Sequence, residues 1–212
     1  MGEILQVDQL TPQAEDLRVA EEVLRRGGVL VMPTDSVYGI GCAATPNNPG
    51  YQRIFQIKRR SLSQTLPWLV ADFDDLARYA ATVPDTALAL ATLFWPGALT
   101  LVVKASHEVP KEYLAADGTV ALRMPDSNLV RELARRVGAP LATTSANTHG
   151  SAAATSGSGI EQRIIEEADL TLDAGPAPLA IASTIVSVAG LKPTVLREGA
   201  ISAHRINKIV GA

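Results

Sequence analysis

The stretch Val29-Leu30-Val31-Met32-Pro33-Thr34-Asp35-Ser36-Val37-Tyr38-Gly39 joins a short apolar run to a polar loop, and it decides the fold class of this chain. Residues 29–32 are apolar and follow two glycines, which predicts a short buried strand. Ligands of open α/β sheets gather near strand ends, so the loop with Thr34, Ser36 and Tyr38 is a candidate binding site. Thr, Asp and Ser also form ordinary turns by bonding their own backbone, so the loop alone leaves both interpretations open.

Outward from this stretch, the chain mixes helical spacing with short strand-like runs. Helices are predicted at 12–26, 49–57, 72–79, 84–94, 126–137, 160–167 and from Ser202, with N-caps at Thr11, Asn48 and Asp126, and strands at 29–32, 66–70, 99–103, 119–123, 140–143, 170–173, 183–188 and 194–196. The small polar residues of 149–159 predict a flexible loop. Because strands and helices do not alternate strictly, we expect an α/β (mixed α+β) fold. It would have a mixed parallel/antiparallel sheet flanked by helices, in a single domain over 1–212.

Composition excludes several classes of protein. Of the 212 residues 47% are hydrophobic, yet no apolar run reaches the roughly 18 residues of a membrane span. The N-terminus lacks a signal-peptide pattern, and Cys42 is the only cysteine, which rules out an internal disulfide. A cytoplasmic protein with no membrane association is therefore expected. The net charge of −3 weighs against a protein that mainly grips nucleic acid, because phosphate binding needs clustered cations.

Polar and cationic residues gather at the ends of the predicted elements. They are Lys58 and Arg60 after a helix, Arg123 at a strand end, Ser183 before a strand, Arg197 after one, and the alternating Thr143, Ser145 and Asn147. In an extended segment this alternation points three side chains the same way. Four cations in one cleft would suit a triphosphate and a carboxylate. Taken singly, each has an ordinary structural explanation, such as a solvated helix end for Lys58 or an ion pair for Arg123.

The common catalytic and phosphate-binding motifs are missing. The chain has no G-x-x-x-x-G-K-[ST] loop, no G-x-G-x-x-G after a strand and no G-x-S-x-G elbow. The three histidines, His107, His149 and His204, are too scattered to form a ligand cluster, so no resident metal site is predicted.

In combination, seven blocks of this sequence resemble the YrdC-like family of threonylcarbamoyl-AMP synthases, from about Val29 to about Ile201. The blocks are 33–41, Lys58-Arg59-Arg60, 95–100, Arg123-Met124-Pro125, Thr144-Ser145-Ala146-Asn147, 183–186 and Leu196-Arg197-Glu198-Gly199. The resemblance implies a twisted mixed sheet around a large positive cavity. It also implies that L-threonine, bicarbonate and ATP, with Mg²⁺ held by the ATP phosphates, react to give threonylcarbamoyl-AMP and pyrophosphate. A separate tRNA threonylcarbamoyl transferase complex would then use the product for threonylcarbamoyladenosine.

The resemblance also implies roles for individual residues. Threonine contacts are implied at Ser36, Arg123, Thr143 and Ser183, and nucleotide contacts at Lys58, Arg60, Thr119, Ser145, Asn147 and Arg197; Thr34, Tyr38 and Gln64 are further candidates. Lys58, Arg60, Ser145 and Asn147 form the K-x-R…S-x-N set to which catalysis is ascribed. The sequence departs from the family pattern at Gln64-Thr65, Leu69 and His149-Gly150. Two alternatives therefore stay open: a module binding double-stranded RNA or tRNA, and a divergent paralogue with another activity or none.

Overall fold

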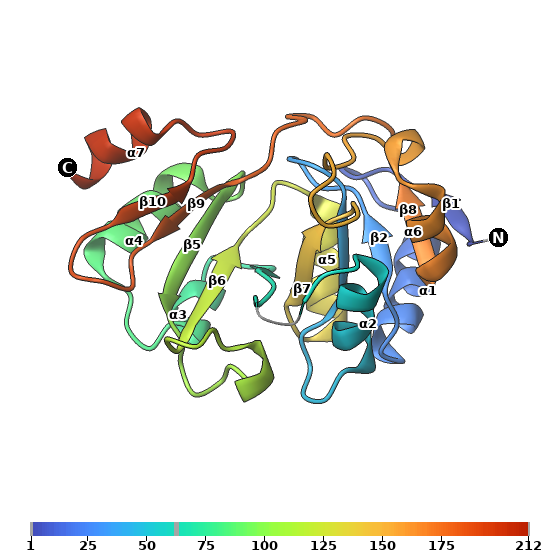
Figure 1. Cartoon of the computed structure of the whole chain (residues 1–212), viewed down its shortest axis with the longest axis horizontal. Coiled ribbons are helices and arrows are strands. Elements are labelled where there is room, and N and C mark those ends of the chain that lie inside the picture. The colour runs from blue at the N-terminus through green and yellow to red at the C-terminus, as the bar shows by residue number, and fades with distance from the viewer. Residues whose placement is uncertain (1, 62–63, 212) are drawn as a thin grey trace.

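A computed structural model describes residues 2–61 and 64–211 of the chain. These residues form one sheet in the order β1-β8-β2-β3-β7-β4-β6-β5-β9-β10 (Figure 1). The strands are β1 (Ile4–Gln6), β2 (Leu30–Met32), β3 (Gly39–Ala43), β4 (Trp68–Leu69), β5 (Leu99–Lys104), β6 (Thr119–Arg123), β7 (Leu141–Ser145), β8 (Leu170–Asp173), β9 (Thr184–Ser187) and β10 (Thr194–Arg197). Neighbours pair both ways: β1/β8, β2/β8, β4/β6 and β5/β9 are parallel, and the others are antiparallel. The predicted mixed sheet is confirmed.

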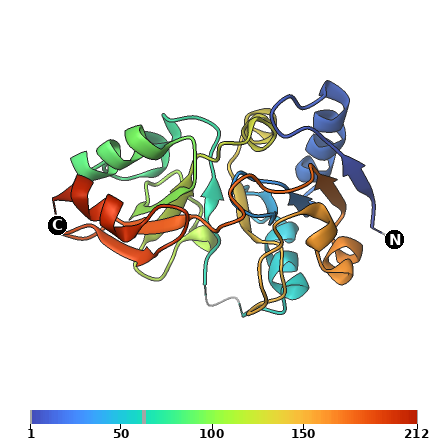
Figure 2. The same cartoon turned by 90° about the horizontal axis from the view of Figure 1, so that it is seen from above.

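Helices cover both faces of the sheet. They are α1 (Ala14–Arg25), α2 (Pro49–Ile57), α3 (Asp75–Tyr79), α4 (Asp85–Phe94), α5 (Asn128–Val137), α6 (Gln162–Glu167) and α7 (Ala203–Val210), with short 3₁₀ turns at Lys111–Tyr113 and Gly157–Gly159. Figure 2 shows α1 and α5 on one side of the sheet and α2 and α6 on the other. Within the described ranges, no helix combines the length and the apolar character that crossing a bilayer requires.

Two hydrophobic cores lie under these helices. One joins α1 and α5 to one face of the sheet through residues such as Leu24 and Leu133. The other lies on the opposite face and contains Phe55 of α2 and Ile164 of α6. Strand β2 contributes to both cores, because Leu30 and Met32 face the first and Val31 the second. A strand buried on both faces is continuously apolar, which is why residues 29–32 were readable as a strand.

The short strand β4 joins two halves of the molecule. Trp68 and Leu69 pair with β7 on one side and with β6 on the other. Figure 1 shows β1, β8, β2, β3 and β7 in one half and β6, β5, β9 and β10 in the other. Strands from both halves and the loop after β2 contribute residues to this junction, and the candidate site lies there.

Most predicted elements are present, although some are shorter than predicted: β4 covers Trp68–Leu69 of the expected 66–70, and α3 covers Asp75–Tyr79 of the expected 72–79. Helix α1 begins at Ala14 rather than after Thr11, and its N-cap residue Gln13 makes no side-chain capping bond. The N-cap of α5 is Ser127, whose hydroxyl accepts from the Val130 N–H at 3.4 Å, and not Asp126. Strands β1 and β3 were not predicted. The first has only three residues, and the second reads Gly-Ile-Gly-Cys-Ala, whose glycines have low strand propensity.

Candidate active site

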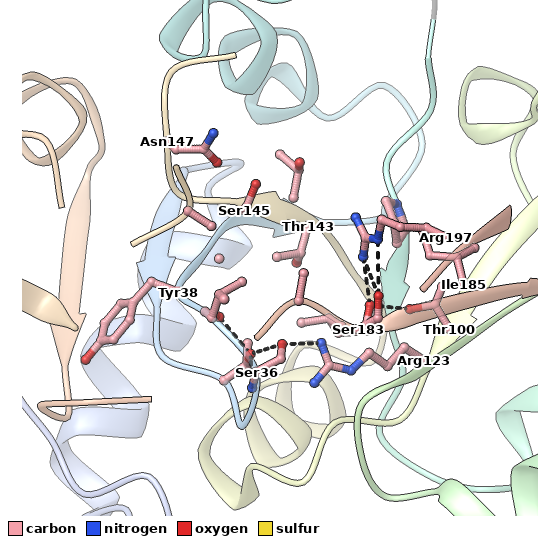
Figure 3. Close-up of a pocket in the computed structure, with 18 of the residues that line it drawn as sticks. Ser36, Tyr38, Thr100, Arg123, Thr143, Ser145, Asn147, Ser183, Ile185 and Arg197 are labelled. Carbon is pink, nitrogen blue, oxygen red and sulfur yellow. Dashed lines mark hydrogen bonds between the residues drawn. The ribbon is translucent and has the colours of Figure 1, made fainter. Parts of the chain in front are cut away.

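A cavity of about 280 Å³ lies at the junction of the two halves, and we call it the inner cavity. Its walls come from the loop after β2, from the start of β3, from β4, β5, β6 and β7, from β9 with the two residues before it, and from the end of β10 (Figure 3). Among its lining residues are nine sequence candidates: Thr34, Ser36, Tyr38, Arg123, Thr143, Ser145, Asn147, Ser183 and Arg197. Segments distant in the sequence therefore converge on one cleft, as their positions at strand ends predict.

Arg123 is the buried cation of the inner cavity. Its Nη1 donates to Ser36 Oγ at 2.7 Å, its Nε donates to the Gly97 carbonyl at 2.9 Å, and its Nη2 forms an ion pair with Asp35 (Figure 3 shows the Ser36 bond). Burial lowers the pKa of Arg123, and the Asp35 carboxylate opposes that shift. Five N–H donors with three occupied leave two for a ligand, so the guanidinium is held in place and can still bind an anion.

A second polar group of the inner cavity lies beside Arg123 and is formed by Thr100, Ser183 and Arg197 (Figure 3). The Thr100 and Ser183 hydroxyls lie 2.9 Å apart, and Arg197 Nη2 donates to the Ser183 carbonyl at 2.6 Å (Figure 3). Burial lowers the pKa of Arg197. Thr100 was not among the sequence candidates, because a single threonine inside an apolar strand carries no signal without its partner.

Thr143 and Ser145 lie opposite two glycines of the neighbouring strand. The register pairs Thr143 with Gly41 and Ser145 with Gly39. A Cβ at Gly39 would come within 2.6 Å of Thr143 Cγ2, and one at Gly41 within 2.5 Å of Thr143 Oγ1. The two glycines of β3 thus leave the room in which the Thr143 side chain lies.

The predicted alternation does not extend to Asn147. Strand β7 ends at Ser145, and the Asn147 N–H turns back to the Ser145 carbonyl at 3.0 Å. Its side-chain amide donates to the carbonyls of Thr148 and Ser151, at 2.9 Å and 2.8 Å. Asn147 does line the inner cavity, but a turn places it there rather than strand geometry.

A larger groove of about 770 Å³ adjoins the inner cavity. Pro67, Thr144, Ile185 and Arg197 line both hollows. The remaining walls of the groove are Tyr51, Gln52, Arg60, Gln64, Thr65, Val102, Glu112, Leu114, Ala115, Ala116, Ala121 and Leu196. Sequence reasoning found Arg60 and Gln64 but missed the opposite wall, because small apolar residues are not distinguishable from core residues by pattern.

Arg60 is the cation on the outer side of the groove. Its Nη2 donates to Gln64 Oε1 at 2.5 Å, its guanidinium lies 5.7 Å from the centre of the Phe55 ring, and its Nε is buried without a hydrogen-bond partner. Burial lowers its pKa. The Arg60–Gln64 contact ties two of the sequence candidates together beside the groove.

Lys58 lies behind the site and lines neither hollow. Its Nζ donates to the carbonyls of Ser145 at 2.5 Å and Asn147 at 2.7 Å, with Asn147 Oδ1 at 3.4 Å. Burial, aided by Arg60, lowers its pKa to about 8. In this structure the ammonium supports the backbone after β7.

Tyr38 and Thr119 also have their polar groups engaged elsewhere. The Tyr38 ring points away from the inner cavity (Figure 3), and its hydroxyl donates to the Gly175 carbonyl at 2.6 Å. Burial raises the pKa of Tyr38 to about 12. The Thr119 hydroxyl donates to Asp117 Oδ1 at 2.7 Å, and Thr119 lines neither hollow. Tyr38 therefore contributes backbone to the wall.

Carboxylates near the site are few. In the part of the chain that the structure describes, no three His, Cys, Asp or Glu residues cluster in a way that could hold a metal ion. Asp35 is paired with Arg123, and Glu112 in the groove accepts the Asn47 N–H at 2.8 Å. These donors do not form a protein cage.

Comparison with known proteins places the chain among relatives. The Sua5/YciO/YrdC family model, described as "Telomere recombination", matches residues 22–199. A putative threonylcarbamoyl-AMP synthase of Mycobacterium leprae is 36% identical over 211 residues, covering 100% of this chain and 95% of that protein. Threonylcarbamoyl-AMP synthase of Pyrococcus abyssi is 32% identical over 195 residues, covering 92% of this chain, but the chain spans only 57% of that longer relative.

Solved structures agree with this placement. The structure of P. abyssi Sua5 complexed with L-threonine matches with a TM-score of 0.89 at 31% identity, over 98% of this chain and 61% of that one. The structure of Escherichia coli YciO matches with a TM-score of 0.87 at 27% identity, over 97% of this chain and 100% of that one. The fold is that of these proteins, and the chain belongs to the Sua5/YciO/YrdC family.

Proposed function

We propose that this chain is a threonylcarbamoyl-AMP synthase, which joins L-threonine, bicarbonate and ATP into threonylcarbamoyl-AMP with release of pyrophosphate. One observation carries the proposal: two hollows with different linings meet at Arg197 and Thr144. A small polar cavity beside a larger groove suits two substrates that must react at a shared boundary.

The inner cavity has the chemistry of an amino-acid site. The two free donors of Arg123 suit a carboxylate, since guanidinium and carboxylate pair with two parallel bonds. Hydroxyls of Ser36, Thr100 and Ser183 offer further donors and acceptors within the same cavity. We assign L-threonine to this cavity, because the chain is similar to P. abyssi Sua5, whose structure was solved in complex with L-threonine.

The groove has the chemistry of a nucleotide site. Arg60 and Arg197 supply two cations for phosphates, and Val102, Leu114 and Ala121 form an apolar wall against which a base can pack. ATP is therefore assigned to the groove, with its α-phosphate toward Arg197. Mg²⁺ bound to the phosphates would offset their charge. The carboxylate of Glu112 is the one acidic group that lines the groove among the described residues.

The reaction needs positioning more than acid–base chemistry. The neutral threonine amine attacks the bicarbonate carbon, and water leaves to give a carbamate. A carbamate oxygen then attacks the α-phosphorus of ATP and displaces pyrophosphate. Arg197, at the boundary, is placed to stabilise charge that develops on the phosphate, and Arg123 holds the amino acid in line. No step requires a covalent bond to the enzyme.

The product is a reactive mixed anhydride, which suits consumption by a second enzyme. We assign that step to a separate transferase that modifies tRNA, and we place the reaction in the cytoplasm. The relative E. coli YciO, named as an uncharacterized protein and 28% identical over 204 residues, shows that the family includes members of unassigned activity, so a direct assay is needed.

The deciding assay measures pyrophosphate release from ATP and Mg²⁺ with bicarbonate and each amino acid in turn. Release that requires both threonine and bicarbonate supports the proposal. Release with another amino acid instead would identify a paralogue with a different substrate. Salt-sensitive binding of double-stranded RNA or tRNA without any release would identify an RNA-binding module. A side chain found acylated or adenylylated by mass spectrometry would refute the direct mechanism.

A further inference from the structure

A set of hydrogen bonds around Thr148, made with Glu161 and Arg163, lies outside both the inner cavity and the groove and connects three elements. We call these three residues the ring. The Glu161 carboxylate accepts from the Thr148 N–H at 2.7 Å and from its hydroxyl at 2.5 Å. Arg163 Nη2 donates to the Thr148 hydroxyl at 2.8 Å, and its Nη1 donates to the Ile57 carbonyl at 2.6 Å. The end of α2, the segment after β7 and the start of α6 are thereby joined.

The ring is directly connected to Lys58. Ile57 precedes Lys58 in the chain, and the Lys58 carbonyl accepts the His149 N–H at 2.9 Å. On the inner side, the Lys58 ammonium holds the carbonyls of Ser145 and Asn147. The segment 145–149 is therefore fixed from within by Lys58 and from without by Glu161 and Arg163.

The Thr148 hydroxyl has a role that only a hydroxyl can perform. Because the carboxylate accepts and the guanidinium donates, this oxygen must donate to Glu161 and accept from Arg163 at once. Glu161 is the N-cap residue of α6, yet its side chain makes no capping bond to its own helix and reaches Thr148 instead. A capping side chain ordinarily satisfies its own helix, so this arrangement is not explained by the stability of α6.

The ring also contributes to the charge environment of Lys58. Burial and, next, Arg60 lower the pKa of Lys58, and Glu161 raises it. The bonds from Thr148 lower the pKa of Glu161, and the charges of Arg163 and Lys58 lower it further. The charged groups that face Lys58 are thus Arg60 from the end of α2 and Glu161 from α6.

We propose that Glu161, Thr148 and Arg163 are positioning residues for this active site. They act through the segment 145–149 and Lys58, because none of the three lines either hollow. The inference rests on the proposed function for its kinetic consequence, but the ring itself is tested without turnover. We expect its loss to impair chemistry and nucleotide binding more than threonine binding, because Arg123, Ser36 and Ser183 are held by other contacts.

Turnover is measured in T148A, T148S, E161Q and the control E166Q. Glu166 lies in α6, and its carboxylate accepts a bond from Gln162 at 3.0 Å. We expect T148A to lower kcat about tenfold with an unchanged KM for threonine. T148S should restore it, because the hydroxyl returns. E161Q should move the alkaline limb of the pH–rate profile to lower pH, because Lys58 loses its supporting carboxylate. E166Q should match the wild type.

A second measurement needs no activity. NMR titration of the Lys58 side chain should show a lower pKa in E161Q than in the wild type and in E166Q, and amide exchange at His149 should be faster in T148A than in T148S. An unchanged Lys58 pKa and unchanged exchange would overturn the proposal, as would equal loss of turnover in T148A and T148S. If these shifts occur in a protein that releases no pyrophosphate, the ring stands and the proposed function fails.

Discussion

Arg123 and Asp35 form a buried ion pair across the junction of the two halves of the sheet. Their side chains are only 7% and 6% exposed, and they belong to the end of β6 and to the loop after β2. Such a pair fixes the orientation of the guanidinium, and Arg123 is one of the residues that line the inner cavity. One Asp35 oxygen, Oδ2, has no hydrogen-bond partner. The pair is therefore better suited to orientation than to maximal stability.

Removal of the Asp35 charge should destabilise the folded protein. The change Asp35→Asn leaves a buried guanidinium without its counter-charge, which we expect to lower the free energy of unfolding by about 3 kcal/mol. Urea unfolding measures it. The matched control is Asp72→Asn, which breaks the exposed Asp72–Arg135 pair and should change stability by less than about 1 kcal/mol. Equal losses in the two variants would show that burial of the Arg123 pair has no special role.

The sequence predicts the site better than it predicts how the site is supported. Ser36, Arg123, Ser183 and Arg197 all follow or precede apolar runs, and the residues at strand ends are where ligands of open sheets gather. The Asp35–Arg123 pair could not be predicted, because the partners are 88 positions apart and only the strand order brings them together. Strand β3 was hidden for a related reason, since its glycines make room for Thr143 and weaken its strand pattern.

Lys58 shows the limit of reasoning from residue type. A cation after a helix beside another cation suggests phosphate binding, and the resemblance implies the same. In the structure its ammonium donates to backbone carbonyls, because the turn at 145–147 presents oxygens that need a buried donor. The contact with a nucleotide stays a prediction. Such a backbone turn has no signature in the sequence Ser-Ala-Asn, which is also an ordinary loop composition.

Gly39 should be essential for the shape of the inner cavity. The variant Gly39→Ala puts a methyl group within 2.6 Å of Thr143 Cγ2, and the β-branched side chain of Thr143 cannot easily rotate about χ1 to make room. We expect the KM for threonine to rise at least about tenfold. The double variant with Thr143→Ser lacks that methyl and should recover most of the loss. A double variant no better than Gly39→Ala alone would contradict the steric explanation.

Arg60 and Arg123 should affect different substrates. Arg60 lines only the groove, so Arg60→Ala should lower turnover at least about tenfold, a loss of about 1.4 kcal/mol, and raise the KM for ATP. Arg123 lines the inner cavity and not the groove, so Arg123→Lys should raise the KM for threonine and leave the KM for ATP unchanged. The lysine ammonium cannot form the two parallel bonds that a guanidinium makes to a carboxylate. The exposed neighbour Arg59, changed to Gln, is the control. Steady-state kinetics with each substrate varied in turn will show whether the effects separate in this way.

Lys58 should make stability depend on alkaline pH, and the sign follows from its lowered pKa. Below pH 8 both the folded and the unfolded chain hold the proton on Lys58, so stability does not change with pH on its account. Between about pH 8 and the ordinary value of 10.5, the unfolded chain holds a proton that the folded chain has released. Raising the pH through that window therefore favours the folded state.

Cys42, whose pKa burial raises to about 12, acts in the opposite direction, so the wild type alone does not isolate the effect of Lys58. The difference in free energy of unfolding between the wild type and Lys58→Met, measured in urea at intervals from pH 7 to 10.5, removes the other groups. That difference should be flat up to about pH 8 and then move in favour of the wild type. A difference that stays constant across the whole range would mean that Lys58 keeps an ordinary pKa in the folded protein and that burial does not lower it.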